Sequence, residues 1–498
     1  MPRIADGSDS RRSPSAALMT GARALCLSNQ AFNSTGLDLS MRTQDRSIAQ
    51  FTTGAEVRAF LALAVPLASA QVAQAAVGFV DTLMMGRLGT NTLAAGGLAA
   101  ICFQLLIAVV GGFVMAVGPL VAQAFGAGQR SEIEAIARQG FWLSLGLSLP
   151  LMAILSQMDR VLLALGQPAA IADLTGPYFQ WILWGALPAL GFAMLRGYVS
   201  ALAQAQVVIV IVLVGTAFNI AGNYALGFGK WGFPALGLGG LGLASGLSYW
   251  LMFGLFLLYT LKHPSLKQYQ FWRRWYWVQP PLIGRMVVMG AELAITIALE
   301  FSLFAVVTFL MGILGPEVLA AHQTVYQTIY LIFMVPLGLS YAATARVGQA
   351  LGQQNMAQTR RAGTVAIAIA AAVMLLATLG LLLFRQPIIG LYLDLSDEAN
   401  ATVVALAMPM FLVAALAQLT DGVQRVASGA LYGLQDTRMP MVLSGLAFWG
   451  VGLTTGYLLG FALGLGGVGL WIGQSIGVAT AGIIFVARFY RLTRPNPS

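Results

Sequence analysis

Apolar runs long enough to cross a lipid bilayer recur along this sequence from Glu56 almost to its end. A helix needs about 20 apolar residues to span the hydrocarbon core of a membrane. Hydrophobic residues make up 58% of the chain and charged residues only 9%, whereas an ordinary soluble domain has roughly 25% charged residues. We therefore predict an all-α integral membrane protein with twelve transmembrane helices. The predicted spans are 57–80, 93–121, 139–157, 173–198, 205–227, 237–261, 286–311, 319–345, 362–384, 400–432, 440–461 and 466–487.

Lys and Arg residues are distributed very unequally between the segments that connect these spans. If the N-terminus is cytoplasmic, 23 of the 27 lie in inner segments or at inner span ends, and four lie outside. Cytoplasmic segments of membrane proteins carry such an excess of positive residues, so we predict that both termini are cytoplasmic. This topology also accounts for the pI near 9.8 without a nucleic-acid partner. The four outer residues are Arg87, Arg160, Lys230 and Arg385.

The segment before the first span is polar and rich in Ser and Arg, and Arg23 interrupts the one stretch that resembles the core of a signal peptide. We expect either a disordered cytoplasmic tail or a reading frame whose translation starts at Met41. The two cysteines, Cys26 and Cys102, provide neither a disulfide framework nor a metal cluster.

The sequence repeats itself at an offset of 226 residues. "MGRLGTNTLAA" (85–95) matches "MGILGPEVLAA" (311–321), and "VAQAFGAGQ" (121–129) matches "VGQALGQQN" (347–355). Each half contains six predicted spans, so both halves begin on the same side of the membrane. We predict two six-helix bundles related as parallel repeats, with a cavity between them. The predicted parts are a disordered cytoplasmic tail (1–55), an N-terminal lobe (56–261), a cytoplasmic linker (262–284), a C-terminal lobe (285–490) and a short cytoplasmic tail (491–498).

Four acidic residues fall within or at the ends of predicted spans: Asp81, Glu292, Glu300 and Asp421. A charge at the bilayer centre costs at least about 2.5–3.5 kcal/mol on insertion scales, so such residues usually face a cavity and act on ions. Glu292 lies only about two turns into its span and could simply reach the interface, so we regard it as a possible minor site.

Glu300 and Asp421 are predicted to lie at a similar depth. Each is 15 residues from the inner end of its span, or roughly 22 Å at the helical rise per residue. Two neighbouring carboxylates suit the binding of a proton or of a small hard cation such as Na⁺. Asn219 and Asn223 share one helix face, and their amides could coordinate a cation, bond a carboxylate or only join helices.

The chain resembles the multidrug and toxic compound extrusion (MATE) family, on its NorM-like branch. The resemblance lies in "GFVDTLMMGRLGTNTLAA", "LEFSLFAVVTFLMGILG", "LAAHQ" and "QLTDGVQRVASGALYGLQD", and it extends in order over about residues 56–490. It implies two six-helix bundles that export organic cations in exchange for Na⁺ or H⁺. We therefore expect a monomeric protein of a bacterial inner membrane, with drugs and lipids as partners and with no cofactor, nucleic acid or ATPase subunit.

The resemblance also assigns site residues. It carries the acids of the family's C-terminal lobe onto Glu300 and Asp421, the acid of the N-terminal lobe onto Asp81, and the polar pair of the fifth span onto Asn219 and Asn223. The chain departs from the family at Glu292, where relatives commonly have a proline at the start of the seventh span.

Other functions are less well supported by the residues. The string "GQSIG" (473–477) fits a serine-hydrolase motif, but it lies inside a span of a chain with two histidines, so we predict that the protein is not an enzyme. No G-x-x-x-x-G-K-[ST] motif is present, and therefore no ATP-driven motor. The alternative within this architecture is a flippase for lipid-linked oligosaccharides, whose anionic cargo would favour a basic cavity. Arg196 and Arg425 are predicted nearer the inner ends, so we favour cationic cargo.

We expect Glu300 and Asp421 to form the coupling-cation site. Binding of the outside cation would disfavour the drug-bound state and so drive release of the drug, because a ligand shifts an equilibrium only through different affinities for the two states. The resemblance favours Na⁺ over H⁺. Tyr326, Phe301 and Trp449 could stack on flat cationic drugs, although such residues are more often packing groups.

Overall fold

The computed structural model of the protein describes residues 52–270, 272, 275, 277–395 and 397–494. Glu56–Ser498 forms one compact unit, distinct from Met1–Ala55. The predictions for the N-terminal tail and for the alternative start at Met41 lie outside the described residues.

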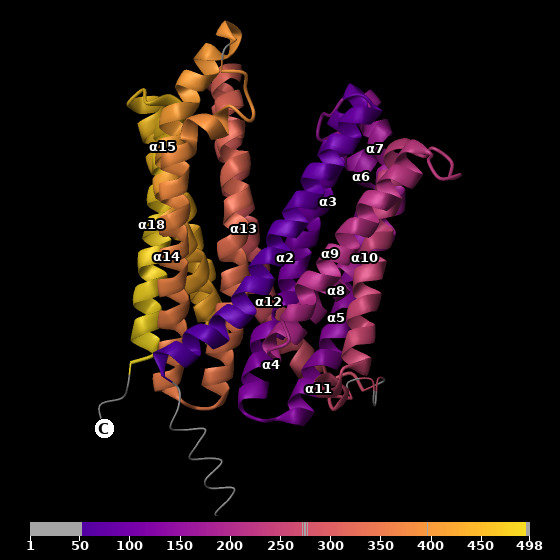
Figure 1. The fold of residues 1–498 in the computed structure, drawn as a ribbon, viewed down its shortest axis with the longest axis vertical. Coiled ribbons are helices and arrows are strands. Elements are labelled where there is room, and N and C mark those ends of the chain that lie inside the picture. The colour runs from indigo at the N-terminus through magenta and orange to yellow at the C-terminus, as the bar shows by residue number, and fades with distance from the viewer. Residues whose placement is uncertain (1–51, 271, 273–274, 276, 396, 495–498) are drawn as a thin grey trace, which may run out of the picture. The chain divides into compact units, whose positions relative to one another are not determined.

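The described part of the chain is helical and contains no β-strand (Figure 1). Three interruptions within apolar helices are π-helical, namely η2 (Asn223–Gly227), η4 (Leu446–Leu453) and η5 (Leu458–Ala462). In the first half the helices are α2 (Thr53–Leu88), α3 (Thr90–Met115), α4 (Val117–Gly126), α5 (Arg130–Leu155), α6 (Met158–Ala164), α7 (Ala169–Ile182), η1 (Leu183–Gly185), α8 (Ala186–Ala201), α9 (Gln206–Gly222), η2 (Asn223–Gly227) and α10 (Gly237–Lys262). The linker and second half contain α11 (Pro264–Lys267), α12 (Pro280–Ile313), α13 (Pro316–Gly352), α14 (Met356–Ile389), η3 (Glu398–Asn400), α15 (Ala401–Gly433), α16 (Arg438–Gly445), η4 (Leu446–Leu453), α17 (Thr454–Tyr457), η5 (Leu458–Ala462) and α18 (Gly466–Leu492).

Eleven of these helices, counted with their short extensions, are long and apolar enough to cross a membrane, and the pair α5–α6 raises the number to twelve if it is one bent span. This pair is bent by 53° and corresponds to the predicted span 139–157. Ser156 lies at the bend, and its hydroxyl donates a hydrogen bond of 2.8 Å back to the Ala153 carbonyl. The prediction of an all-α membrane protein with about twelve spans is confirmed, although most of the helices extend beyond the predicted ends.

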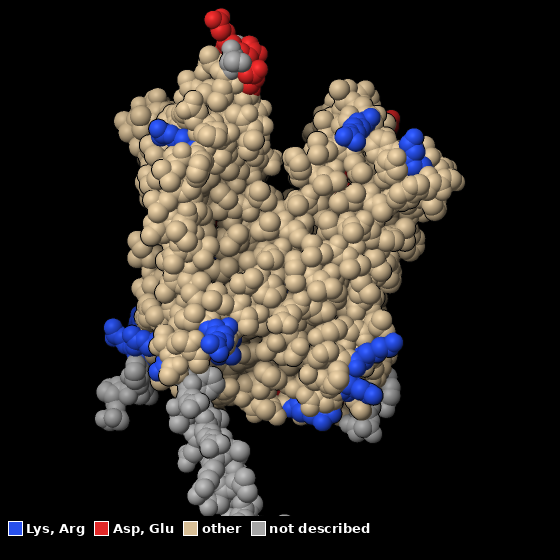
Figure 2. All heavy atoms as spheres, viewed as in Figure 1, with Lys and Arg blue, Asp and Glu red and all other residues tan. Residues whose placement is uncertain are grey.

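The surface agrees with this arrangement. Charged side chains on the visible face gather toward the two ends of the helices, and the band between them is uncharged (Figure 2). Because lipid offers no partner for a charge, such a band suits a helical bundle in a bilayer.

The repeat is visible in the backbone as well as in the sequence. Gly89, between α2 and α3, has φ 129° and ψ 159°, and Gly315, between α12 and α13, has φ 128° and ψ 159°. Gly128 and Gln354, which follow the next helices of each half, also share a positive φ, at 68° and 56°. Both pairs are separated by the 226 residues of the sequence repeat. The repeat therefore places equivalent turns at equivalent points of the two halves.

Two apolar cores stabilise the bundle. The first contains most of the buried side chains of the first half, and the second contains only residues between Leu303 and Phe489. Helix α12 contributes to both, because Met286 and Met289 belong to the first core whereas Leu303, Val307 and Met311 belong to the second. Helix α12 thus links the two cores, as do α13, α14 and α15, which also have residues in both.

Glycines let helices of the two halves approach each other closely. A Cβ atom on Gly338 would lie 2.3 Å from the Ala68 Cα, and one on Gly126 would lie 1.9 Å from the Gln349 carbonyl oxygen. Helices meet this closely in membranes where small residues line the interface.

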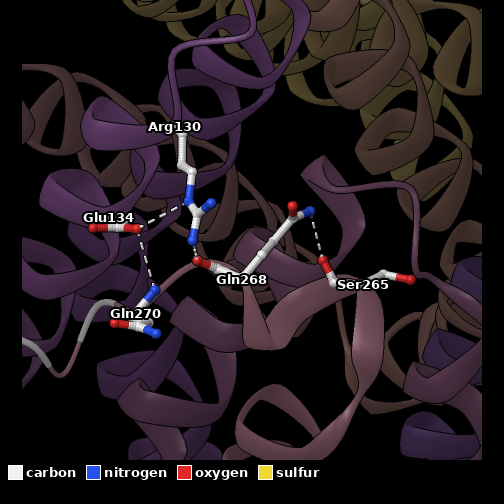
Figure 3. Close-up of polar contacts among 5 residues, drawn as sticks. All are labelled: Arg130, Glu134, Ser265, Gln268 and Gln270. Carbon is white, nitrogen blue, oxygen red and sulfur yellow. Dashed lines mark hydrogen bonds and ion pairs between the residues drawn. The ribbon is translucent and has the colours of Figure 1, made fainter.

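The linker is bound to the start of α5 (Figure 3). The Arg130 guanidinium donates to the Gln268 carbonyl, and a Glu134 carboxylate oxygen accepts from the Gln270 backbone N–H at 3.3 Å. Further along, Gln139 donates to the Trp277 carbonyl at 2.9 Å. We call this end of the bundle the linker end and the opposite end the far end. The element order places the four basic residues predicted to be external, Arg87, Arg160, Lys230 and Arg385, toward the far end.

Candidate functional site

A cavity of about 430 Å³ lies between helices of the two halves. Its walls come from α2, α3, α7, α8, α9 and α10 of the first half and from α12, α13 and α15 of the second. Figure 2 shows a hollow in the surface at the far end, between the regions where Figure 1 labels α3 and α13. Among the predicted site residues, Asp81, Asn219, Glu300 and Asp421 all line this cavity. Asn223 lies directly behind its wall.

The first half contributes a hydrogen-bonded chain that starts at Asp81. The amide nitrogen of Asn223 lies 2.6 Å from Asp81 Oδ1 and 3.1 Å from Asn219 Oδ1, and the amide of Asn219 donates to Ser245 Oγ at 3.1 Å. The π-helical turn η2 begins at Asn223, and such turns frequently occur at functional sites. Asn223 therefore bonds the Asp81 carboxylate, and Asn219 and Ser245 extend the chain.

The Oδ1 atom of Asn223 is buried and has no hydrogen-bond partner within the described part of the chain. An amide oxygen in this situation can accept a proton donor or contact a cation. The carboxylate of Asp81 and this amide oxygen together could hold a cation or a protonated group in the first half.

A guanidinium from α8 also faces the cavity. Arg196 Nη1 donates to Gln71 Oε1 at 2.7 Å, and its guanidinium lies 4.8 Å from the ring centroid of Tyr341 and 5.8 Å from that of Phe192. The partners of this charge are thus an amide and two aromatic rings, which stabilise a cation without neutralising it.

The second half brings Glu300 and Asp421 to the same cavity, but with a cation between the two helices. Arg425 of α15 forms an ion pair with Glu300 of α12 and lies over the ring of Phe333, 5.0 Å from its centroid. Asp421, one turn before Arg425, forms no ion pair or hydrogen bond with any residue that the structure describes. The two acids share a cavity, but the ion pair of Arg425 is formed with Glu300 and not with Asp421.

Arg196 and Arg425, which were predicted toward the inner ends of their spans, also line the cavity. The ion pair between Arg425 and Glu300 was not predicted. The cavity wall carries three carboxylates and two guanidiniums, a formal charge of −1. The spacing of Asp421 and Arg425, four residues apart on one helix, could have revealed this neighbour.

Glu292 and Trp449 do not line the cavity. The hydroxyl of Thr437 donates to the Glu292 carboxylate near the linker end of α12, which fits the interface position considered for this residue. The indole nitrogen of Trp449 donates to the Leu299 carbonyl at 3.3 Å, so Trp449 packs between helices, whereas Tyr326 and Phe301 line the cavity.

A second polar contact closes the linker end and was not predicted. Arg346 of α13 binds both carboxylate oxygens of Glu56 of α2, at 2.9 and 2.6 Å, and donates to Gln349 at 2.9 Å. The Gln349 amide in turn donates to the Ala201 carbonyl at 2.8 Å. We call Glu56, Arg346, Gln349 and Ala201 the linker-end latch, because it ties α13 to α2 and α8.

The structure offers no preformed metal centre among its described residues, where no three His, Cys, Asp or Glu side chains are grouped to hold an ion. A coupling ion would be transported cargo. Its ligands would be one or two carboxylates together with amide, hydroxyl or backbone oxygens.

The chain is similar to known proteins along most of its length. The sequence profile of the MatE family matches residues 66–225 and 293–458. A protein of Synechococcus sp. described as "Probable multidrug resistance protein NorM" is 56% identical over 443 residues, which cover 89% of this chain and 96% of that protein. A Synechocystis sp. protein with the same description is 48% identical over 455 residues, covering 91% and 97% of the two chains.

Solved structures share the fold at lower identity. The eukaryotic MATE transporter AtDTX14 superposes with a TM-score of 0.75 at 22% identity, covering 89% of this chain and 99% of that one. A MOP superfamily transporter from Pyrococcus furiosus, described with a reverse polarity of its binding pocket, gives a TM-score of 0.79 at 19% identity, with 88% and 96% of the two chains covered.

Proposed function

Because this chain belongs to the MatE family, we propose that it is a secondary active multidrug efflux transporter that exports organic cations in antiport with Na⁺ or H⁺. The observation that carries the proposal is the cavity between the two halves, with an unpaired carboxylate on α15 and a second one on α2. A cavity of about 430 Å³ is within the size range of sites for drug-sized ligands.

The cavity lining supports aromatic monovalent cations as cargo. Tyr326, Phe301 and Tyr249 present rings to the cavity, and rings and carboxylates together attract a flat organic cation. The net negative formal charge of the wall acts in the same direction. Only one negative charge is in excess, so a single positive charge on the cargo balances it.

Coupling is proposed to use the carboxylates Asp81, Glu300 and Asp421. Binding of the outside cation in the cavity favours the drug-free state, and this difference in affinity is what links the ion gradient to export. Oxygen atoms of Asn219 and Asn223 beside Asp81 suit Na⁺ as well as a proton, and Na⁺ remains our first choice for the coupling ion.

An oligosaccharide-lipid flippase is the alternative because two guanidiniums face the cavity. Arg425 is paired with Glu300, and Arg196 is covered by Gln71 and Tyr341, so neither is presented freely to an anionic head group. We therefore keep the cation exporter as the proposed function.

The protein is proposed to act as a monomer in a bacterial inner membrane, with the linker end and both termini in the cytoplasm. The cluster of basic residues around the linker and the small number at the far end support this orientation.

Transport by purified protein in lipid vesicles tests the proposal. Ethidium efflux is measured after imposing a Na⁺ gradient, a proton gradient or neither, with protein-free vesicles as the control. Gradient-dependent efflux is the expected result. Movement of a fluorescent polyprenyl-linked sugar without ethidium efflux would instead support the flippase.

A further inference from the structure

Arg425 lies between two carboxylates of the cavity wall. Its guanidinium pairs with Glu300 across the contact between α15 and α12, and Asp421 precedes it by one turn on α15. Residues four apart on a helix are neighbours on its surface, so the Arg425 charge acts on Asp421 as well. The side chains of Arg425 and Glu300 are only 9% and 15% exposed, and burial strengthens such interactions.

The guanidinium is held from two sides. Glu300 supplies the opposite charge, and the ring of Phe333 lies 5.0 Å from the guanidinium carbon. The Nε atom of Arg425 is buried without a hydrogen-bond partner among the described residues. Few other groups therefore compensate this charge, and Glu300 is its main partner.

The pair changes the charge that the second half offers to a ligand. Without Arg425, two carboxylates would face the cavity from α12 and α15, and they would suit a divalent cation or two monovalent ones. With the pair formed, the formal charge that the second half presents to the cavity is −1. The carboxylate outside the pair is that of Asp421.

We propose that Arg425 is a built-in counter-ion for Glu300 and that it leaves Asp421 as the carboxylate of the second half that binds one monovalent cation. In cargo binding, Glu300 is then a positioning residue, which acts on the cargo by neutralising Arg425, whereas its proposed part in coupling concerns the outside cation. The inference rests on the proposed export of cations, and it adds that the single charge of the cargo is selected by this internal pair.

Paired substitutions of Glu300 and Arg425 test this role of the ion pair. Glu300→Gln removes a negative charge and leaves Arg425 unpaired beside Asp421, which should weaken binding of a monovalent cation. The interaction of two unit charges about 6 Å apart, at an effective dielectric constant of about 20, corresponds to roughly 100-fold in a binding constant, so we expect a weakening of at least about tenfold. Adding Arg425→Gln removes the unpaired charge and should restore binding to within about threefold, even though Glu300 is still absent.

Equilibrium dialysis with radiolabelled tetraphenylphosphonium, a monovalent aromatic cation, measures these effects on purified full-length protein. Wild type, Glu300→Gln, Arg425→Gln, the double variant and Asp421→Asn are compared, with size-exclusion profiles and thermal unfolding as checks of folding. Arg425→Gln alone should bind more tightly than wild type, and Asp421→Asn should lose binding. The Arg425→Gln variant tests the proposal even if Glu300→Gln does not fold.

Arg196→Gln provides the matched control, because it removes the other cavity guanidinium, whose partner is the neutral Gln71. Restoration of Glu300→Gln by Arg425→Gln but not by Arg196→Gln supports a local pair. A double variant that binds as weakly as Glu300→Gln, or equal restoration by Arg196→Gln, would overturn the proposal, as would undiminished binding by Glu300→Gln. Tight binding without gradient-driven efflux would contradict only the proposed function, since the binding comparison does not depend on transport.

Discussion

Replacing Glu56 with Gln is expected to open the linker end of the protein. Glu56 is fully buried and accepts two hydrogen bonds from Arg346, whose side chain is 14% exposed. Removing one partner of a buried ion pair costs about 3–5 kcal/mol, because the other charge remains desolvated. Arg346 keeps its bond to Gln349 and some contact with solvent, so we take about 3 kcal/mol, the lower limit of that range.

This free energy acts on the equilibrium between closed and open linker ends. If the pair exists only in the closed state, a loss of about 3 kcal/mol raises the open fraction roughly 100-fold, at about 1.4 kcal/mol per factor of ten. A cysteine introduced by Ser200→Cys reports the opening, because Ser200 is buried and lines a small cavity of about 50 Å³ beside the latch. In a chain whose native cysteines are replaced, labelling by an impermeant maleimide from the linker side should accelerate by up to that factor.

Two further variants sharpen this measurement. Glu317→Gln makes the same chemical change at an exposed residue at the far-end start of α13, and it should leave the labelling rate unchanged. Combining Glu56→Gln with Arg346→Gln removes both charges and should recover part of the effect. A labelling rate in Glu56→Gln within a factor of two of the parent would refute the role given to the latch.

Three other predictions concern transport and topology. Glu300→Gln should abolish gradient-driven ethidium efflux with normal membrane insertion, whereas Glu292→Gln, outside the cavity, should retain efflux within about twofold of wild type. Asn223→Leu removes the amide that bonds Asp81 and should reduce the initial efflux rate at least about tenfold, because an unpartnered buried carboxylate loses a charge-assisted bond of about 1.5–3 kcal/mol. A single cysteine beside Arg160 should react with an impermeant reagent from outside the cell, and labelling only from the cytoplasmic side would contradict the orientation.

The helical framework could be predicted because the signal is local. Each span is a run of apolar residues, and the repeat lies in short strings around Gly89 and Gly315 that the chain uses twice for the same turn. The bend between α5 and α6 was missed, since hydropathy measures the length of an apolar run and not its direction.

The composition of the cavity was predicted only in part, because its contacts join distant positions. Asp81 and Glu300 could be found as acids in apolar surroundings, but the pairing of Glu300 with Arg425 spans 125 residues, and that of Glu56 with Arg346 spans 290. A count of depth along each helix cannot say which face a side chain takes, so it did not reveal that Arg425 pairs with Glu300. Ser245 carried no signal, since an isolated serine in a span is common.

The way α12 links the two cores has a mechanical consequence. Its segment up to Met289 is packed with the first core, and its segment from Leu303 onward is packed with the second. If the cores tilt against each other as rigid bodies, α12 must flex between these two anchor points or lose one of them. Glu300 lies on that short stretch. The residue that pairs with Arg425 is therefore in the part of α12 that would bend. Bending of α12 and the charge of the cavity would then both depend on the position of Glu300.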